Sequence, residues 1–214
     1  MRLRSFIKKA RIKILKIFKK DINFIYNEPF AIENLQGLKF ANKMGEIIDI
    51  EFHPQSVVDF GCGTATILEY FERKGIEILG IDGSEANRKY SRINVKNFVL
   101  FDIRRKYTVT HKYDLCMCLE VGEHIEEKYS DMLINNLIMS SSTILFGAAP
   151  VGQGGTDHCN EKPYVWWIER FKKYNFEFDK NRTDKLRKKL SSIPDIFYWY
   201  INNIMVFSEM SLHL

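Results

Sequence analysis

Apolar stretches of strand length alternate with stretches of helical spacing along most of this chain. The pattern predicts strands at 56–60, 77–82, 97–101, 113–119 and 142–147, and helices at 38–49, 66–74, 86–94 and 130–139. This alternation is typical of an α/β protein with a doubly wound sheet, in which parallel strands are covered by helices on both faces.

The last third of the chain departs from this alternation. A helix is expected from Pro163 onward, and a basic surface helix at 184–190 separates two further apolar runs at 175–179 and 200–207. No repeat, low-complexity stretch or glycine-proline linker interrupts the pattern. A length of 214 residues suits one domain with a substantial core.

Acidic residues follow the predicted strands, at the edge of the sheet where α/β proteins bind ligands. Segment 57–63, Val-Val-Asp-Phe-Gly-Cys-Gly, reads as a buried strand whose two closing glycines let backbone N–H groups approach a ligand. An acid at Asp82 can bind both hydroxyls of a ribose, whereas Thr66 stands where a nicotinamide-binding fingerprint has glycine. The strand-end positions are Asp59, Asp82, Asp102, Glu120 and the loop after Gly147.

The motif Asp-x-Gly-x-Gly, with a second acid at the end of the next strand, resembles the class I S-adenosylmethionine (SAM) methyltransferases. Ala65 departs from the pattern, because many members carry a third glycine there. The resemblance implies SAM as cofactor and a Rossmann-like, doubly wound, mostly parallel seven-stranded sheet. It also implies that 175–179 and 200–207 close the sheet as an antiparallel C-terminal hairpin.

The same resemblance implies roles for individual residues. An acid at Asp102 would accept a hydrogen bond from the adenine amino group, and a helix N-cap or a solvated turn is its alternative role. The cofactor-binding residues expected are Asp59, Gly61, Cys62, Gly63, Asp82, Gly83, Asp102, Ile103, Leu119 and Glu120.

Two carboxylates and two imidazoles in this part of the sequence predict a site for a divalent metal ion or for a general base. Glu123 and His124 follow Glu120 by three and four residues, so a helical turn would direct all three to one side. His158, in the glycine-rich loop after the fifth strand, could join them as a ligand of Mg²⁺ or Mn²⁺. This set resembles metal-dependent O-methyltransferases. Related enzymes carry the same motif without a metal, and there His158 or His124 would act alone as general base.

Segment 152–167 resembles bacterial methyltransferases encoded among surface-polysaccharide and capsule genes. This implies O-methylation of a small-molecule, sugar or phosphate acceptor, with Trp166 or Trp167 either stacked on a sugar or packed in the core. One alternative is an RNA 2′-O-methyltransferase, which the acidic body of the protein disfavours. Another is a non-catalytic SAM-binding subunit that supports a partner.

Basic residues are concentrated at the N-terminus. The net charge is +5, and the first 20 residues hold nine Lys or Arg and no acid, so the remainder carries −4. We expect an amphipathic arm at 1–35 and the methyltransferase domain at 36–214. The arm suits an anionic membrane surface, a protein partner, or ordinary packing on the domain or on a second subunit. Unpaired cysteines and no apolar run of about 20 residues predict a cytoplasmic protein, peripheral at the inner membrane surface if the arm binds lipid.

Overall fold

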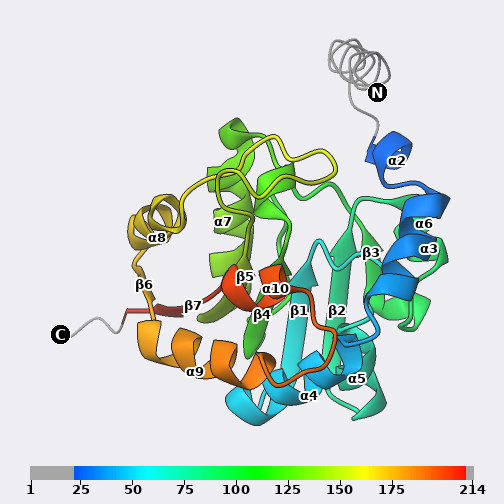
Figure 1. The fold of residues 1–214 in the computed structure, drawn as a ribbon, viewed down its shortest axis with the longest axis horizontal. Coiled ribbons are helices and arrows are strands. Elements are labelled where there is room, and N and C mark those ends of the chain that lie inside the picture. The colour runs from blue at the N-terminus through cyan, green and yellow to red at the C-terminus, as the bar shows by residue number, and fades with distance from the viewer. Residues whose placement is uncertain (1–21, 211–214) are drawn as a thin grey trace.

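A computed structural model describes residues 22–210 of the protein, which form a seven-stranded sheet with the order β3-β2-β1-β4-β5-β7-β6 (Figure 1). The first five strands are parallel, and β7 pairs antiparallel with both β5 and β6. This confirms the predicted mostly parallel sheet with an antiparallel C-terminal hairpin. The strands are β1 Ser56–Phe60, β2 Glu77–Asp82, β3 Phe98–Leu100, β4 Leu115–Leu119, β5 Thr143–Gly147, β6 Phe176–Phe178 and β7 Ile204–Glu209.

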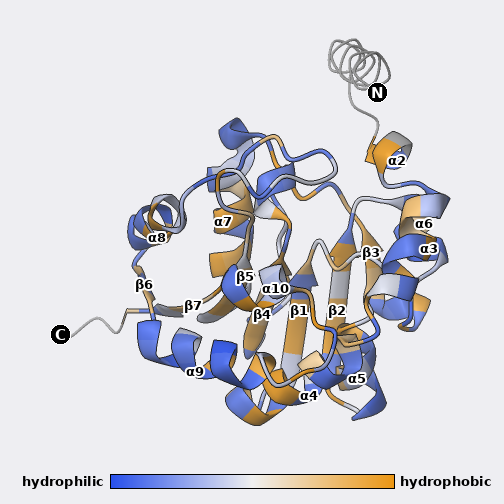
Figure 2. Ribbon diagram, viewed as in Figure 1, coloured by the Kyte–Doolittle hydropathy of each residue, from blue (hydrophilic) through white to orange (hydrophobic). Residues whose placement is uncertain are grey.

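Helices cover both faces of the sheet. Neighbouring residues of the buried strands face opposite cores: Val57 packs with α4, α5 and α9, and Val58 packs with α7 and α8. Strands buried on both faces explain the uninterrupted apolar runs of the sequence. Figure 2 shows mainly hydrophobic strands and a largely hydrophilic α9. The α-helices are α2 Ile22–Ile25, α3 Glu28–Gly37, α4 Ala41–Phe52, α5 Leu68–Arg73, α6 Glu85–Lys89, α7 Ser130–Ser140, α8 Tyr164–Lys172, α9 Lys180–Leu190 and α10 Tyr198–Asn202.

The chain before the last strand differs from the sequence expectation. A strand was expected over 200–207, but α10 occupies Tyr198–Asn202 and β7 begins at Ile204. The Tyr200 ring packs 5.3 Å from the Phe40 ring, centroid to centroid. An apolar run with aromatic residues at successive positions fits either periodicity, and here packing against Phe40 favours the helix.

The N-terminal helices pack against the domain. The Ser84 hydroxyl donates a 2.6 Å hydrogen bond to the Tyr26 carbonyl, and Glu28 forms an ion pair with Lys89 of α6. The expected boundary between residues 35 and 36 falls inside α3. The basic segment 1–20 lies outside the described residues. Among residues 22–210, no helix is long and apolar enough to cross a membrane.

Candidate active site

A pocket opens at the carboxyl ends of the parallel strands. One wall comes from the segments that follow β1 to β4, and the opposite wall from α2, α3 and Tyr200. All expected cofactor residues line this pocket except Asp59, which is 5% exposed and lies in the last part of β1. The structure therefore brings together residues as distant in the sequence as Gly61 and Glu120. The lining residues from the predicted set are Gly61, Cys62, Gly63, Asp82, Gly83, Asp102, Ile103, Leu119 and Glu120.

The turn after β1 depends on backbone conformations that favour glycine. Gly61 and Gly63 have φ of 76° and 56°. A Cβ at Gly61 would lie 2.4 Å from Cγ2 of Val121, so this position lacks space as well. Ala65 keeps the same left-handed conformation, with φ of 58°. The alanine is accommodated at the cost of some backbone strain.

Asp82 ties the end of β2 to this turn. One carboxylate oxygen accepts from the Gly63 N–H at 3.0 Å, and the other accepts from the Ser84 N–H at 2.8 Å and the Asn87 amide at 3.1 Å. Burial raises the pKa of Asp82, and these hydrogen bonds oppose the rise. Burial and the Asp82 carboxylate raise the pKa of Asp59 to about 7.

Asp102 reaches the pocket already paired with a cation. Arg104 donates to both Asp102 oxygens, at 2.9 Å from Nε and 2.8 Å from Nη2. These bonds lower the pKa of Asp102, so the group is an ionised hydrogen-bond acceptor. Arg104 also lines the pocket and was not anticipated from the sequence.

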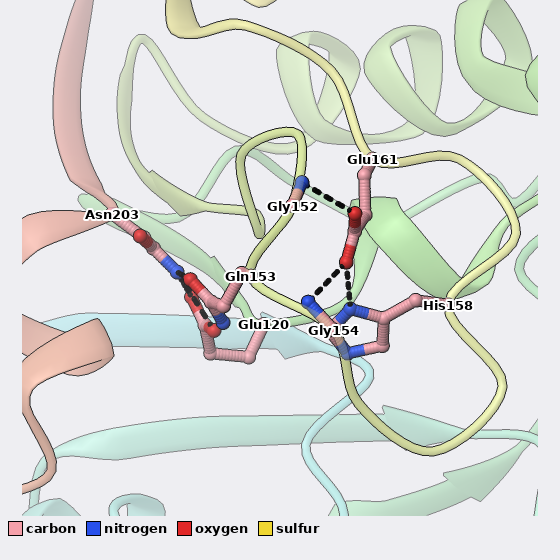
Figure 3. Close-up of polar contacts among 7 residues, drawn as sticks. All are labelled: Glu120, Gly152, Gln153, Gly154, His158, Glu161 and Asn203. Atoms are coloured by element: carbon pink, nitrogen blue, oxygen red, sulfur yellow. Dashed lines mark hydrogen bonds and ion pairs between the residues drawn. The ribbon is translucent and has the colours of Figure 1, made fainter.

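Glu120 has a polar partner that its spacing with Glu123 and His124 did not predict, the amide of Asn203. The φ of Glu120 is 57°, and Gly122–His124 then forms a 3-10 turn instead of an α-helical one. The Asn203 amide donates to both Glu120 oxygens, at 3.0 and 2.9 Å, and also to Gln153 at 3.1 Å (Figure 3). Burial raises the pKa of Glu120 to about 7.

Three of the four expected metal ligands do come together. Glu123, His124 and His158 each offer a ligand atom within 4.8 Å of the others. The two imidazole rings meet edge to face, with centroids 4.9 Å apart. Glu123 is 1% exposed, and burial followed by the Glu120 carboxylate raises its pKa well above the usual range. His124 lines the pocket, whereas His158 is not among the lining residues and has 11% of its side chain exposed.

The far wall of the pocket was not anticipated from the sequence. Tyr26 contacts the Phe30 ring at 5.1 Å and the His124 ring at 5.9 Å. The Ile22 side chain lies directly on Gly83. A Cβ built on Gly83 would be 2.6 Å from Cδ1 of Ile22. The spacing of four between Tyr26 and Phe30 is a signal, but it does not show what the two rings face.

The two tryptophans of α8 differ in surroundings. Trp167 is fully buried against Phe146, which agrees with the core alternative. Trp166 is covered by the Arg170 guanidinium, 4.0 Å from the ring centroid, and by the Lys162 ammonium at 5.1 Å. Neither ring is among the residues that line the pocket.

Comparison of the sequence with known proteins identifies related domains. Residues 30–140 match the sequence model of a family described as "Methyltransferase domain". The ubiquinone biosynthesis O-methyltransferase of Acinetobacter baylyi is 27% identical over 84 residues, 36% of this chain and 35% of that protein. Its counterpart in Acinetobacter baumannii is 31% identical over 84 residues, with the same coverage. The chain thus spans about a third of the length of the curated relatives it matches.

Solved structures share the fold over most of the chain. A TehB-like SAM-dependent methyltransferase from Corynebacterium glutamicum superposes with a TM-score of 0.58 at 15% identity, covering 98% of this chain and 100% of the other. The O-methyltransferase of a trans-AT polyketide synthase multienzyme from Brevibacillus brevis, in complex with S-adenosyl-L-homocysteine, superposes with a TM-score of 0.56. The two sequences are 20% identical, and the match covers 90% of this chain and 80% of the other chain.

Proposed function

Because the chain belongs to the family of methyltransferase domains and has the class I fold, we propose that it transfers the methyl group of SAM to an oxygen of a small, neutral acceptor. One observation carries the proposal. The pocket at the strand ends is lined by the glycine turn and by the acids Asp82, Asp102 and Glu120 together. This is the position at which open α/β sheets bind their ligands.

SAM suits the charges of this pocket. In the proposed complex the ribose lies at Asp82, the adenine at Asp102 and Ile103, and the methionine at Gly61–Gly63 and Glu120. The sulfonium and ammonium groups of SAM are cationic, and buried carboxylates favour such charges. A cationic ligand would also stabilise the ionised forms of Asp59 and Glu120, which burial disfavours.

The acceptor would lie between the SAM methyl group and the wall formed by Tyr26 and His124. Its oxygen attacks the methyl carbon in line with the departing sulfur; the carbon–sulfur bond breaks, and S-adenosylhomocysteine leaves. His124 takes the hydroxyl proton, since it lines the pocket. Alignment of the three reacting atoms supplies much of the acceleration.

The lining of the pocket favours a neutral acceptor over a phosphate. It contains the acids Asp82, Asp102, Glu120, Glu126 and Asp157, and its Arg104 is paired with Asp102. An anionic acceptor would be repelled there, and the same argument disfavours an RNA backbone. A sugar hydroxyl of a polysaccharide precursor and a catechol are both neutral, and both fit the proposal.

A divalent cation is a second form of the proposal, favoured by the grouping of Glu123, His124 and His158. Glu123 is 1% exposed and lies beside the Glu120 carboxylate, so a cation there would offset the repulsion between two buried acids. One carboxylate and two imidazoles suit Mn²⁺ better than Mg²⁺, which prefers oxygen ligands. When bound there, the cation would lower the pKa of the acceptor hydroxyl.

Calorimetric titration of the chelator-treated protein tests these statements. We expect SAM and S-adenosylhomocysteine to bind without metal, and labelled SAM to methylate members of a panel of catechols and methyl glycosides. A Mn²⁺ isotherm lost in His124→Ala would support the cation.

Turnover of an RNA 3′ end instead would favour the RNA alternative, and SAM binding with no turnover of any acceptor would favour the non-catalytic one. Absence of SAM binding would refute the proposal.

A further inference from the structure

The loop between β5 and α8 folds around one carboxylate, that of Glu161. One of its oxygens accepts from the Gly154 N–H at 2.6 Å and contacts Nδ1 of His158 at 2.9 Å, and the other accepts from the Gly152 N–H at 2.8 Å (Figure 3). The Glu161 side chain is 20% exposed. A single side chain thus joins two backbone N–H groups of the glycine-rich loop to the imidazole of His158.

This arrangement determines which nitrogen of His158 carries the proton. Each oxygen of Glu161 already accepts a hydrogen bond from a backbone N–H group, which favours the ionised carboxylate. An ionised carboxylate can only accept hydrogen bonds. Nδ1 of a neutral His158 must therefore be the protonated nitrogen, and Nε2 keeps its lone pair.

Glycine on the other side of the ring completes the placement. A Cβ at Gly155 would lie 2.2 Å from Nε2 of His158, so only glycine leaves room for the imidazole in this position. The same ring meets His124 edge to face. His158 is thus held at Nδ1 by Glu161, confined at Nε2 by Gly155, and directed at the cluster with Glu123 and His124.

We propose that Glu161 is a positioning residue that fixes the tautomer and orientation of His158, so that Nε2 of His158 is available as an acceptor or ligand beside Glu123 and His124. The inference rests on the proposed methyl transfer, because it assigns His158 a role beside the acceptor wall. A carboxylate bonded to the remote nitrogen of a functional histidine is a recurrent way of setting its tautomer. Glu161 would act only through His158 and would not touch the acceptor.

The test is the ¹⁵N spectrum of His158 in the full chain saturated with S-adenosylhomocysteine, at a pH of about 8.5 where a free imidazole is neutral. We expect Nδ1 to show the shift of a protonated nitrogen and Nε2 that of an unprotonated one. Glu161→Ala should abolish this preference. Glu161→Gln should retain it, because its carbonyl oxygen still accepts from Nδ1. Glu169→Gln, an exposed change on the neighbouring α8, is the control for loss of one charge and should leave the spectrum unchanged.

The outcomes separate this inference from the proposed function. Unchanged binding of S-adenosylhomocysteine in Glu161→Ala, together with a lost tautomer preference, supports a positioning role. A protonated Nε2 and an unprotonated Nδ1 in the unaltered protein would overturn the inference even if every variant failed to fold. The methyl transfer proposal would survive that result, since it depends on SAM binding and turnover.

Discussion

Asp82 shows how one side chain can support both a turn and a ligand site. Its oxygens accept three hydrogen bonds, and the one from Gly63 connects the end of β2 to the turn after β1. Loss of either oxygen as acceptor would leave a buried N–H group without its partner, which costs about 1–3 kcal/mol. The shape of the cofactor pocket therefore depends on the charge state of this residue.

We predict that Asp82→Asn lowers the affinity for S-adenosylhomocysteine at least tenfold, about 1.4 kcal/mol. The asparagine has one acceptor oxygen, so it cannot serve the Gly63 and Ser84 N–H groups as the carboxylate does. Calorimetry measures the change. Asp114→Asn is a matched control, because Asp114 accepts the Gln55 and Ser56 N–H groups at the opposite end of β1. Equal affinity in Asp82→Asn and the unaltered protein would contradict the prediction.

The sequence predicted that Glu120 lies at the site but not how its side chain is arranged there. The identity of the pocket acids followed from their positions at strand ends, and the pocket contains Asp82, Asp102 and Glu120 but not Asp59. The shared direction of Glu120, Glu123 and His124 depended on an α-helical turn, whereas Glu120 has a left-handed φ of 57°. The turn that follows is a 3-10 turn and not an α-helical one, and no spacing rule reports the φ of Glu120.

At the scale of elements, strands buried on both faces were the easiest to predict. The expected bounds 56–60 and 77–82 agree with β1 and β2, because continuous apolar runs closed by Asp59 or Asp82 permit few alternatives. The start of β7 was wrong, since the aromatic run before Ile204 suits helix and strand alike. The pocket wall at Tyr26 was missed because its contacts are tertiary, and the spacing between Tyr26 and Phe30 does not show what their rings face.

The junction between β1 and the segment after β4 gives a prediction about packing. Gly61→Ala places a methyl group 2.4 Å from Val121 at a φ of 76°, so it carries a steric cost and a backbone cost. The backbone cost is about 1–2 kcal/mol, and overpacking adds about 1–3 kcal/mol. We expect Gly61→Ala to lower the melting temperature by several degrees. Adding Val121→Ala to this variant should restore only the stability lost to the steric clash, because the backbone cost remains.

A matched glycine separates the two costs. Gly75 has a φ of 75°, and a Cβ there would meet nothing within 4 Å. Gly75→Ala should therefore show the backbone cost alone, measured by the same thermal unfolding. If Gly61→Ala were no more destabilising than Gly75→Ala, the close approach of Val121 would not matter to stability.

At the scale of the whole molecule, acidic groups gather at the end of the sheet where the ligand is proposed to bind. Burial raises the pKa of both Asp59 and Glu120 to about 7. In an unfolded chain these carboxyl groups have ordinary pKa values and are ionised at neutral pH. In the folded protein they are either ionised without water around them or protonated against the pH. Both possibilities lower the free energy of unfolding around neutral pH.

The pH dependence of stability follows from the sign of the shift at Asp59. Its contribution to stability is fully present below the ordinary aspartate pKa of 3.8 and is lost as the pH rises through about 7. The loss is about 1.4 kcal/mol for each pH unit in that window. Asp59→Asn removes the titrating group. The melting temperature of this variant minus that of the unaltered protein should therefore rise between pH 4 and pH 7 and stay constant above pH 7. A difference that is constant or falls with pH would contradict the assignment.

Two truncations distinguish the basic arm from the pocket wall, although both belong to the N-terminal segment. Removal of residues 1–20 takes away nine basic side chains and leaves Ile22, Tyr26 and Phe30 in the wall, so the affinity for S-adenosylhomocysteine should change less than twofold. Removal of 1–35 deletes that wall and uncovers Gly83, and the affinity should fall at least tenfold. Calorimetry measures both, with circular dichroism to confirm folding. Tyr26→Ala in the full chain, which should weaken binding without any truncation, shows whether the wall itself is responsible. Full affinity after removal of 1–35 would instead place the start of the functional domain at residue 36 and make α2 and α3 dispensable for the cofactor.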